Sequence, residues 1–234
     1  MSKKIVFLGV LGLTLLGSVW VYSRKSDNNP KPAINSSNIV NSNKQSETTQ
    51  SSELIIGNPN AKFTVIEYAD FKCPECGKFH SDSGKKLKKD YIDTGKIKIL
   101  FRPFPISSED GAQALIGSYC ANQQGKFNQY YDKLFDYMWQ NHFKQGDYQK
   151  MIDPVFTDDL IKTILQEIDI DQAKYFECRQ SPQTKEIYLA DVFKASPDEV
   201  QGTPTYIIGD QKIVGNQPYQ IFKTLLDVKL SENQ

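Results

Sequence analysis

The sequence lacks most features that would mark a nucleic-acid-binding, zinc-binding or haem protein. Its 28 basic and 28 acidic residues cancel, and no long block of like charge predicts a nucleic-acid footprint. It has only four cysteines and two histidines, and Cys73 and Cys76 have no second close pair with which to complete a structural zinc site. Gly77, where haem attachment would require histidine, follows Cys76. We therefore expect no nucleic acid, metal or cofactor.

Long hydrophobic runs are also scarce, and the one present lies within residues 1–25. Lys3 and Lys4 precede uncharged, mostly apolar residues 5–22, which as a helix would just cross a hydrocarbon core of ~30 Å. We predict an uncleaved membrane anchor. A cleaved signal peptide is the alternative, although no small-x-small cleavage site follows the run, and a buried core helix is the least favoured interpretation. Both leading interpretations place the remainder in the periplasm or another extracytoplasmic space.

Residues 26–52 are rich in Asn, Ser, Gln, Thr and Lys and have hardly any apolar side chains. Such a segment cannot bury enough surface to offset the entropy of ordering it. We predict a flexible tether with a root-mean-square span on the order of 30 Å.

Residues 53–230 have the pattern of one folded α/β domain. The β-branched and aromatic runs at 63–71 and 96–104 predict strands, and helical spacing joins them over 74–91. Two short strands around a Gly-Asp turn follow at 203–215, and an amphipathic helix closes the domain at 217–230. Between the two halves of the sheet, an insertion at about 107–196 contains helical stretches at 109–123, 126–139, 158–168, 171–179 and 184–194.

Cys73 and Cys76 lie three residues apart, directly before the first predicted helix. A cysteine at a helix N-cap, followed by a proline such as Pro74, faces unpaired backbone N–H groups and the positive end of the helix dipole. This environment favours the thiolate, so we predict Cys73 as the nucleophile and Cys76 as the cysteine that resolves mixed disulfides. A purely structural disulfide is the alternative, but closing so small a ring adds little stability.

Two segments resemble a known family. VIEYADFKCPECGKFH, residues 65–80, resembles the active-site segment of DsbA-like thiol:disulfide oxidoreductases of the thioredoxin superfamily. GTPTYIIGDQKIVG, residues 202–215, resembles their cis-proline loop and final hairpin. The resemblance extends over about residues 54–226 and is weaker through the helices. It implies a thioredoxin-like fold with a helical insertion between the two halves of the sheet.

The same resemblance implies roles for individual residues. Thr203 and Pro204 would form a substrate-binding loop with a cis peptide bond beside the cysteines. Glu67 matches a buried acid that takes the proton of the inner cysteine, and burial would raise its pKa toward the range needed for that role. An exposed carboxylate at a sheet edge is the alternative for Glu67. His80, four residues after Cys76, is interpreted as structural or surface-exposed.

The remaining cysteines, Cys120 and Cys178, form the one other pair available if Cys73 bonds to Cys76. The resemblance supports this structural disulfide, because many relatives have cysteines near both positions. Two buried, unpaired thiols are the alternative.

The function implied is an extracytoplasmic thiol:disulfide oxidoreductase that introduces disulfides into exported proteins. Its partners would be unfolded or reduced exported proteins and a membrane redox partner that reoxidises it, and we expect a monomer. Pro74-Glu75 replaces the Pro-His dipeptide of DsbA, and the Glu75 carboxylate should make the disulfide less oxidising. The alternatives are a disulfide isomerase or reductase, favoured by Thr203, and a non-catalytic thioredoxin-fold binding or metallochaperone module.

The apolar segment and the tether generate a prediction about topology. Lys3 and Lys4 should stay in the cytoplasm, with the folded domain on the other side of the inner membrane, because basic residues are retained on the cytoplasmic side. After cell fractionation and a carbonate wash, the full-length chain should remain in the membrane pellet. A full-length product that is soluble in the cytosol would contradict this topology.

Overall fold

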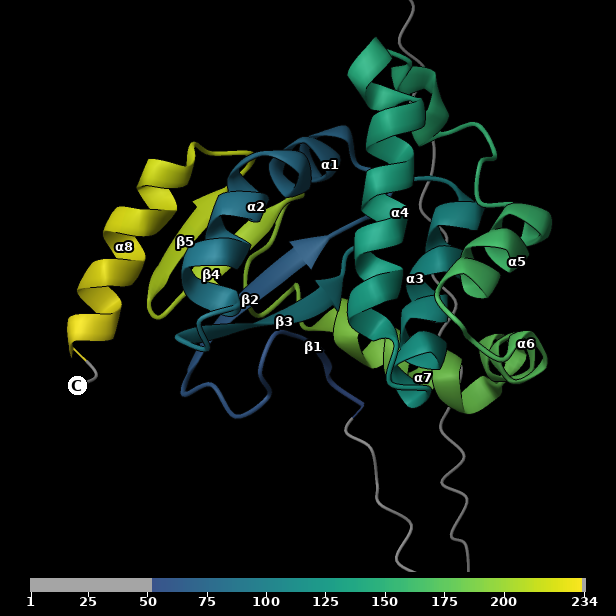
Figure 1. Cartoon of the computed structure of the whole chain (residues 1–234), viewed down its shortest axis with the longest axis horizontal. Coiled ribbons are helices and arrows are strands. Elements are labelled where there is room, and N and C mark those ends of the chain that lie inside the picture. Colours follow the sequence, from purple (N-terminus) through teal and green to yellow (C-terminus); the bar gives the residue numbers. More distant parts are fainter. Residues whose placement is uncertain (1–51, 233–234) are drawn as a thin grey trace, which may run out of the picture. The chain divides into compact units, whose positions relative to one another are not determined.

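The computed structural model describes residues 52–232. The predicted anchor and nearly all of the predicted tether therefore lie outside the described residues. Within residues 52–232, no helix combines the length and apolar character that a bilayer span requires. One five-stranded sheet forms the centre of the fold (Figure 1), with the strand order β1-β3-β2-β4-β5. The strands are β1 (Leu54–Ile56), β2 (Phe63–Ala69), β3 (Ile97–Pro103), β4 (Thr205–Ile208) and β5 (Gln211–Val214).

The two long strands form the middle of this sheet. Strands β2 and β3 are parallel, with Val65 opposite Ile99, while all other neighbouring strands are antiparallel. Residues of β3 alternate between buried and half-buried, as expected for β-branched and aromatic residues on a pleated strand. Strand β1, which is too short for the sequence pattern to identify, adds an antiparallel edge beside β3.

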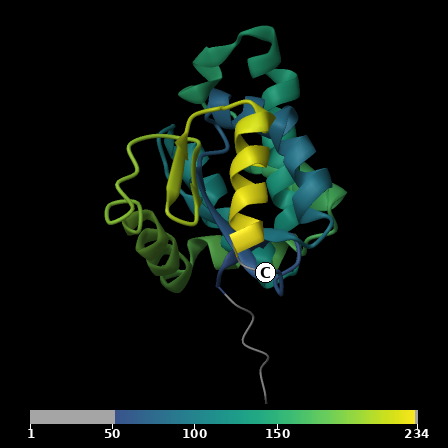
Figure 2. The same ribbon diagram turned by 90° about the vertical axis from the view of Figure 1, so that its left-hand side faces the viewer.

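One group of helices packs near the sheet, and a second group forms the insertion (Figure 1). Helices α7 and α8 lie on opposite sides of the β4–β5 hairpin (Figure 2). The predicted helical insertion between β3 and β4 is confirmed, and it comprises helices α3 to α7 with two short 3₁₀ turns. The helices are α1 (Pro74–Ser81), α2 (Ser83–Leu87), α3 (Glu109–Gln123), α4 (Phe127–Asn141), α5 (Asp158–Glu167), α6 (Gln172–Gln180), α7 (Pro182–Phe193) and α8 (Tyr219–Glu232).

The helix predicted over 74–91 is interrupted. Helix α1 ends before Asp82, whose φ and ψ of −121° and −87° leave the helical region, and a π-helical turn at Lys88–Ile92 follows α2. Gly84 permits the bend, because a Cβ there would lie 3.0 Å from the carbonyl oxygen of Phe79. Ser83 holds the new direction by donating a hydrogen bond of 3.1 Å to the carbonyl of Gln217. The hydrophobic spacing indicated helix correctly but contained no signal for this tertiary bend.

An aromatic cluster joins the insertion to the sheet. The ring of Phe71, directly after β2, lies 5.6 Å from that of Phe101 on β3 and 5.0 Å from that of Phe135 on α4. All three side chains are fully buried, and burial of each contributes about 1.5–3 kcal/mol to folding. The residues just before the cysteines are therefore packed against both layers.

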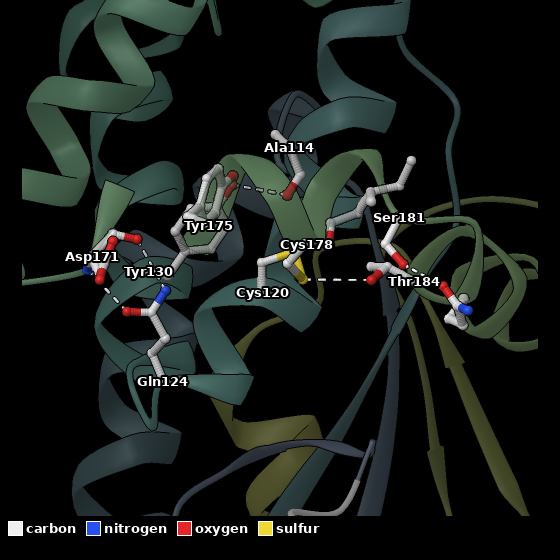
Figure 3. Close-up of a disulfide and its surroundings, with 11 residues drawn as sticks. Ala114, Cys120, Gln124, Tyr130, Asp171, Tyr175, Cys178, Ser181 and Thr184 are labelled. Atoms are coloured by element: carbon white, nitrogen blue, oxygen red, sulfur yellow. Dashed lines mark hydrogen bonds between the residues drawn. A yellow bond between two sulfur atoms is a disulfide. The ribbon is translucent and has the colours of Figure 1, made fainter. Parts of the chain in front are cut away.

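The insertion contains a disulfide between Cys120 on α3 and Cys178 on α6 (Figure 3). Nearby, the hydroxyl groups of Tyr130 and Tyr175 are hydrogen-bonded at 2.8 Å, and Tyr130 also donates to the carbonyl of Ala114 at 3.0 Å. Gly117 makes room for both hydroxyls, because a Cβ there would lie 1.9 Å from the Tyr175 oxygen. Helices α3, α4 and α6 are thus tied together by a covalent bond and a buried polar contact.

This disulfide generates a prediction about stability. It joins residues 58 positions apart, and replacing both cysteines with alanine should lower the free energy of unfolding by about 4 kcal/mol, because the unfolded chain regains loop entropy. Urea unfolding of the wild type and of the Cys120→Ala/Cys178→Ala variant measures the difference. Peptide mapping of unreduced protein supplies the control. If both cysteines can be alkylated after denaturation without reductant, the bridge is absent.

Candidate active site

Helix α1 begins directly at the cysteine pair. Cys73 is the N-cap, with extended backbone at φ −78° and ψ 120°, and Pro74 occupies the first helical turn. The Cys73 sulfur accepts a hydrogen bond of 3.4 Å from the backbone N–H of Cys76. It thus occupies the position where helix N–H groups have no intrahelical partner and where negative charge is stabilised. Cys73 is only 3% exposed, so a reacting partner must approach it closely.

The two cysteines have opposite electrostatic environments. A hydrogen bond with the Cys76 side chain lowers the pKa of Cys73 and outweighs its burial, with further help from Thr203 and the Cys76 backbone. Burial raises the pKa of Cys76 well above its ordinary value, and the neighbouring Cys73 raises it further. The structure therefore favours a thiolate on Cys73 and a protonated thiol on Cys76. The first is suited to attack, and the second needs a base before it can react.

The loop predicted to bind substrate lies beside Cys73. The Thr203-Pro204 peptide bond is cis, and the carbonyl oxygen of Thr203 lies 3.5 Å from the Cys73 sulfur. The carbonyl of Pro204 accepts a hydrogen bond of 2.7 Å from the N–H of Gly215, which joins the loop to the end of β5. The structure thus brings together two segments that are 130 residues apart in the chain.

Glu67 lies in the buried middle of the sheet, so the alternative of an exposed edge carboxylate is wrong. Glu67 is 2% exposed, and its carboxylate accepts hydrogen bonds from the hydroxyls of Tyr131, at 2.9 Å, and Tyr206, at 2.8 Å. Burial raises the pKa of Glu67, although both tyrosines and the nearby His80 lower it in part. A Cys76 thiolate in turn raises the pKa of both tyrosines, so the inner cysteine acts electrostatically on the two side chains that bind this carboxylate.

Glu75, between the cysteines, is exposed. The amide nitrogen of Asn216 lies 3.3 Å from its carboxylate and donates a hydrogen bond to it. This contact joins the CxxC segment to the turn after β5, on the same hairpin as the cis-proline loop.

The predicted site residues do not include Asp70 and Lys72, two fully buried charged residues in the turn before Cys73. The Asp70 carboxylate accepts hydrogen bonds from the backbone N–H groups of Lys72, Ile106 and Ser107 at 2.9 to 3.0 Å, and its carbonyl accepts one of 3.0 Å from Cys73. The sequence does contain a signal for these residues, because Asp70 and Lys72 are charged and directly follow a mostly apolar strand. Asp70 also has a chemical effect, since its negative charge raises the pKa of Cys73 in part.

The Lys72 side chain runs into the insertion, where its buried ammonium forms an ion pair with the half-buried Asp110 at the start of α3. The ammonium lies 2.8 and 3.0 Å from the two carboxylate oxygens and donates to the carbonyl of Asp153 at 2.8 Å. Burial raises the pKa of Asp110, but hydrogen bonds from Lys72, Ser108 and the N–H groups of Val155 and Phe156 outweigh burial and hold that pKa at about 2. One ion pair thus anchors the turn before Cys73 to two parts of the insertion.

The structure therefore assembles most, but not all, of the predicted site residues. Cys73, Cys76, Thr203 and Pro204 meet at the start of α1, and Glu67 lies below them in the sheet. Cys120 and Cys178 form their disulfide within the insertion and belong to its packing. Across residues 52–232, no group of three or more histidine, cysteine or acidic side chains is arranged to hold a metal ion.

Comparison with known proteins places this geometry in a family. A thioredoxin family model matches residues 49–228. The probable disulfide bond formation protein D of Bacillus cereus is 29% identical over 189 residues, which are 78% of this chain and 81% of that protein. The oxidised crystal structure of BdbD from Bacillus subtilis matches with a TM-score of 0.66 at 24% identity, over 77% of this chain and 94% of that chain. A periplasmic thioredoxin-like protein from Salmonella enterica serovar Typhimurium has a TM-score of 0.58 at 22% identity, over 77% and 91% of the two chains.

Fold, site and family match together define the class: a DsbA-like thiol:disulfide oxidoreductase, with a thioredoxin-like sheet, a helical insertion and a cysteine pair at the start of α1. The chain belongs to the thioredoxin family. The predicted fold class and the predicted family resemblance are both confirmed.

The buried ion pair generates a prediction about stability and pH. Asp110→Asn leaves the Lys72 ammonium, which is 0% exposed, without its counter-charge and should lower the free energy of unfolding by about 3–5 kcal/mol at pH 7. Because the folded pKa of Asp110, about 2, lies below its ordinary 3.8, the pair's contribution is complete above pH 4 and is lost as pH falls toward 2. Urea unfolding at pH 7 and near pH 2 tests this. The difference in unfolding free energy between wild type and variant should be smaller near pH 2 than at pH 7.

The exposed pair of Lys86 and Asp82, at 2.9 Å, provides the matched control. Lys86→Met should change the unfolding free energy by less than about 1 kcal/mol, because exposed ion pairs contribute little. Equal effects of Lys86→Met and Asp110→Asn would contradict the importance of the buried pair.

Proposed function

We propose that this chain is an extracytoplasmic dithiol oxidase that introduces disulfides into exported proteins through Cys73 and Cys76. The observation that carries the proposal is the difference between the two sulfurs. Cys73 lies at a helix N-cap, where its pKa is lowered, whereas Cys76 lies one turn further in, where burial raises its pKa. A cysteine pair with this asymmetry can exchange disulfides in a fixed order, outer sulfur first.

In the oxidising direction, a substrate thiolate attacks the Cys73 sulfur of the Cys73–Cys76 disulfide. The bond between the cysteines breaks, Cys76 leaves with the electron pair and takes up a proton, and a mixed disulfide links Cys73 to the substrate. A second substrate thiolate then attacks the substrate sulfur and releases Cys73 as a thiolate. The lowered pKa of Cys73 makes it a good leaving group in this step.

Substrate positioning is assigned to the loop at Thr203 and Pro204. The Thr203 carbonyl lies 3.5 Å from the Cys73 sulfur, and proline leaves position 204 without an N–H group. The backbone of an extended substrate segment can pair beside this loop, which would present its cysteine to Cys73. Backbone recognition of this kind suits a substrate class of unfolded or reduced exported proteins with varied sequences.

A proton acceptor is needed when the dithiol is reoxidised by a membrane redox partner. Cys73 then forms the mixed disulfide with the partner, and Cys76 must lose its proton to attack the Cys73 sulfur. We assign this role to Glu67, which is buried, has a pKa raised by burial, and is bound by two tyrosines on which Cys76 acts electrostatically. A carboxylate with a raised pKa is a stronger base than an exposed one, as general-base catalysis near neutral pH requires.

Isomerase or reductase activity is the second candidate, favoured by Thr203 before the cis-proline. Glu75 also points in this direction. It is exposed at the second position between the cysteines, where its negative charge opposes a thiolate on Cys73. A thiolate that is stabilised less makes the disulfide less oxidising. We therefore place the redox potential between those of DsbA, about −120 mV, and thioredoxin, about −270 mV.

The proposed oxidase activity predicts that the full-length chain catalyses disulfide formation in a reduced peptide with two cysteines. Cys73→Ser should abolish catalysis, because no sulfur remains to form the mixed disulfide. Equilibration of the wild type against glutathione buffers should give an intermediate potential. A potential as low as that of thioredoxin would contradict the oxidase proposal. Full activity in Cys73→Ser would contradict the enzymatic role of the pair.

The proposed role of Glu67 predicts slower resolution of mixed disulfides in Glu67→Gln, by about 10²-fold near neutral pH, because a neutral amide cannot accept the Cys76 proton. Rapid-quench mass spectrometry of the Cys73–glutathione mixed disulfide measures the rate. The wild-type rate should rise with pH as Glu67 ionises, and the variant should lack this rise. The variant should fold at least as stably at pH 7, because a raised folded pKa means that ionisation of Glu67 costs stability as pH increases. Equal rates over the pH range would exclude Glu67 as the base.

A further inference from the structure

The buried Glu67 needs a route by which its proton reaches solvent. Glu67 is 2% exposed, and each of its carboxylate oxygens accepts a hydrogen bond from a tyrosine hydroxyl, Tyr131 or Tyr206. Of these tyrosines, Tyr206 is enclosed by the rings of Phe79 and Phe222, at 4.7 and 5.0 Å. Tyr131 instead borders a cavity of about 230 Å³ between α1, α2 and α4. The carboxylate therefore has one neighbour that leads toward open space.

The same cavity is lined by the His80 imidazole, together with Asp132 and Asp136 of α4. The imidazole ring lies 5.4 Å from the Tyr131 ring and is stacked on Phe135 at 5.2 Å, so its orientation is set by packing. A cavity of this size holds several water molecules at about 30 Å³ each. Tyr131 and His80 both line this cavity, so water in it would lie between the two side chains.

His80 also has the right partners to take up and release a proton. Its Nε2 lies 3.1 Å from the Asp132 carboxylate, whose side chain is 42% exposed and therefore in contact with bulk water. Its Nδ1 has no hydrogen-bond partner among the described residues and lies 3.7 Å from an Asp136 oxygen that likewise has none. An imidazolium donates from both ring nitrogens, so protonation would satisfy both carboxylates at once.

We propose that His80 is the proton-exchange residue that connects the buried Glu67 with solvent through Tyr131 and the cavity. This proposal rests on the proposed role of Glu67 as the base for Cys76. His80 acts on the reaction only through Tyr131 and Glu67. Its proposed role is to pass on the proton, and it is not itself a catalytic residue. The sequence analysis interpreted His80 as structural or surface-exposed, and the cavity supports a more specific role.

The step balances as follows. The Cys76 thiol gives its proton to Glu67, and the Cys76 sulfur attacks the Cys73 sulfur of the mixed disulfide. The Cys73–Cys76 bond forms, the bond from Cys73 to the partner breaks, and the partner sulfur leaves with the electron pair. The Glu67 proton then passes to the Tyr131 oxygen as that hydroxyl gives its own proton to cavity water. The water passes a proton to His80, and His80 releases one to bulk solvent past Asp132.

Several charged groups surround His80 and would affect the pH dependence of this transfer. Glu67 of β2 acts electrostatically on one side, because His80 lowers the pKa of that carboxyl in part. The other groups around the cavity come from α2, the turn that follows it, and α4: Lys85, Lys88, Tyr131, Asp132 and Asp136. The two carboxylates are the charged groups nearest the ring, at 3.1 Å for Asp132 and 3.7 Å for Asp136.

The test is the rate at which the Cys73–glutathione mixed disulfide resolves in the full-length chain. His80→Gln should slow resolution about tenfold near neutral pH, less than the ~10²-fold or more of a group that itself takes the proton of the reacting atom, because His80 acts after Glu67. Added imidazole should restore most of the lost rate in this variant and change the wild type little, because the cavity admits small proton carriers. The double variant Glu67→Gln/His80→Gln should be no slower than Glu67→Gln, because residues in series are not additive.

His142→Gln is the matched control, because it removes the other histidine, which contacts Asp147 and Tyr137 instead. It should resolve at the wild-type rate. If His80→Gln does so as well while Glu67→Gln is slow, the role of His80 is overturned and that of Glu67 stands. If Glu67→Gln itself is unaffected, both proposals fail.

A slow His80→Gln variant that imidazole does not restore indicates a packing role and also overturns the proposal. Circular dichroism establishes whether the variant folds. If it does not, Asp132→Asn retains the His80 ring and replaces its exposed carboxylate partner with a neutral amide that cannot take up a proton. That variant should be slower than the wild type and restored by imidazole, and an unchanged rate would overturn the relay.

Discussion

The turn between strand β2 and helix α1 is held by two buried opposite charges, and the reactivity of both cysteines depends on it. Asp70 binds the backbone of the turn and of the loop after β3, while Lys72 extends into the insertion and pairs with Asp110. A buried charge is tolerated only when it is paired and hydrogen-bonded, so each partner constrains the other. Cys73 is therefore held at the helix N-cap by contacts with both layers of the fold.

From that fixed position, the difference between the cysteines follows from one helical turn. At the N-cap, a sulfur faces unpaired N–H groups, whereas Cys76 inside the helix faces the core, where burial penalises its thiolate. The Thr203 carbonyl, 3.5 Å from Cys73, defines the side from which a partner can approach. The helix thus sets the order of reaction, and the cis-proline loop sets its direction of access.

The polar interior below the cysteines complements this arrangement. An acid placed among aromatic rings would be costly without hydrogen bonds, and Glu67 has two, from Tyr131 and Tyr206. Their hydroxyls stabilise the carboxylate without supplying a counter-charge, so the pKa of Glu67 stays raised. Tyr131 also lines the cavity that His80 borders, so one of the two hydrogen-bond partners of the acid adjoins this cavity.

The sequence by itself determined the chemistry of the pair, because the relevant physics is local. Two cysteines one turn apart, with Pro74 between them, define an N-cap sulfur and a buried sulfur without reference to the rest of the chain. The same holds for strands β2 to β5 and for the helical insertion, since each of these elements carries its own periodicity, whereas β1 is too short to do so. Only the tertiary structure decided the environment of the site. Glu67 meets Tyr131 and Tyr206, 64 and 139 residues away, and hydrophobic spacing identifies buried positions but not which of them will meet. The bend at Asp82 and the pairing of Lys72 with Asp110 were likewise decided by packing, because both depend on groups that only the folded chain brings together.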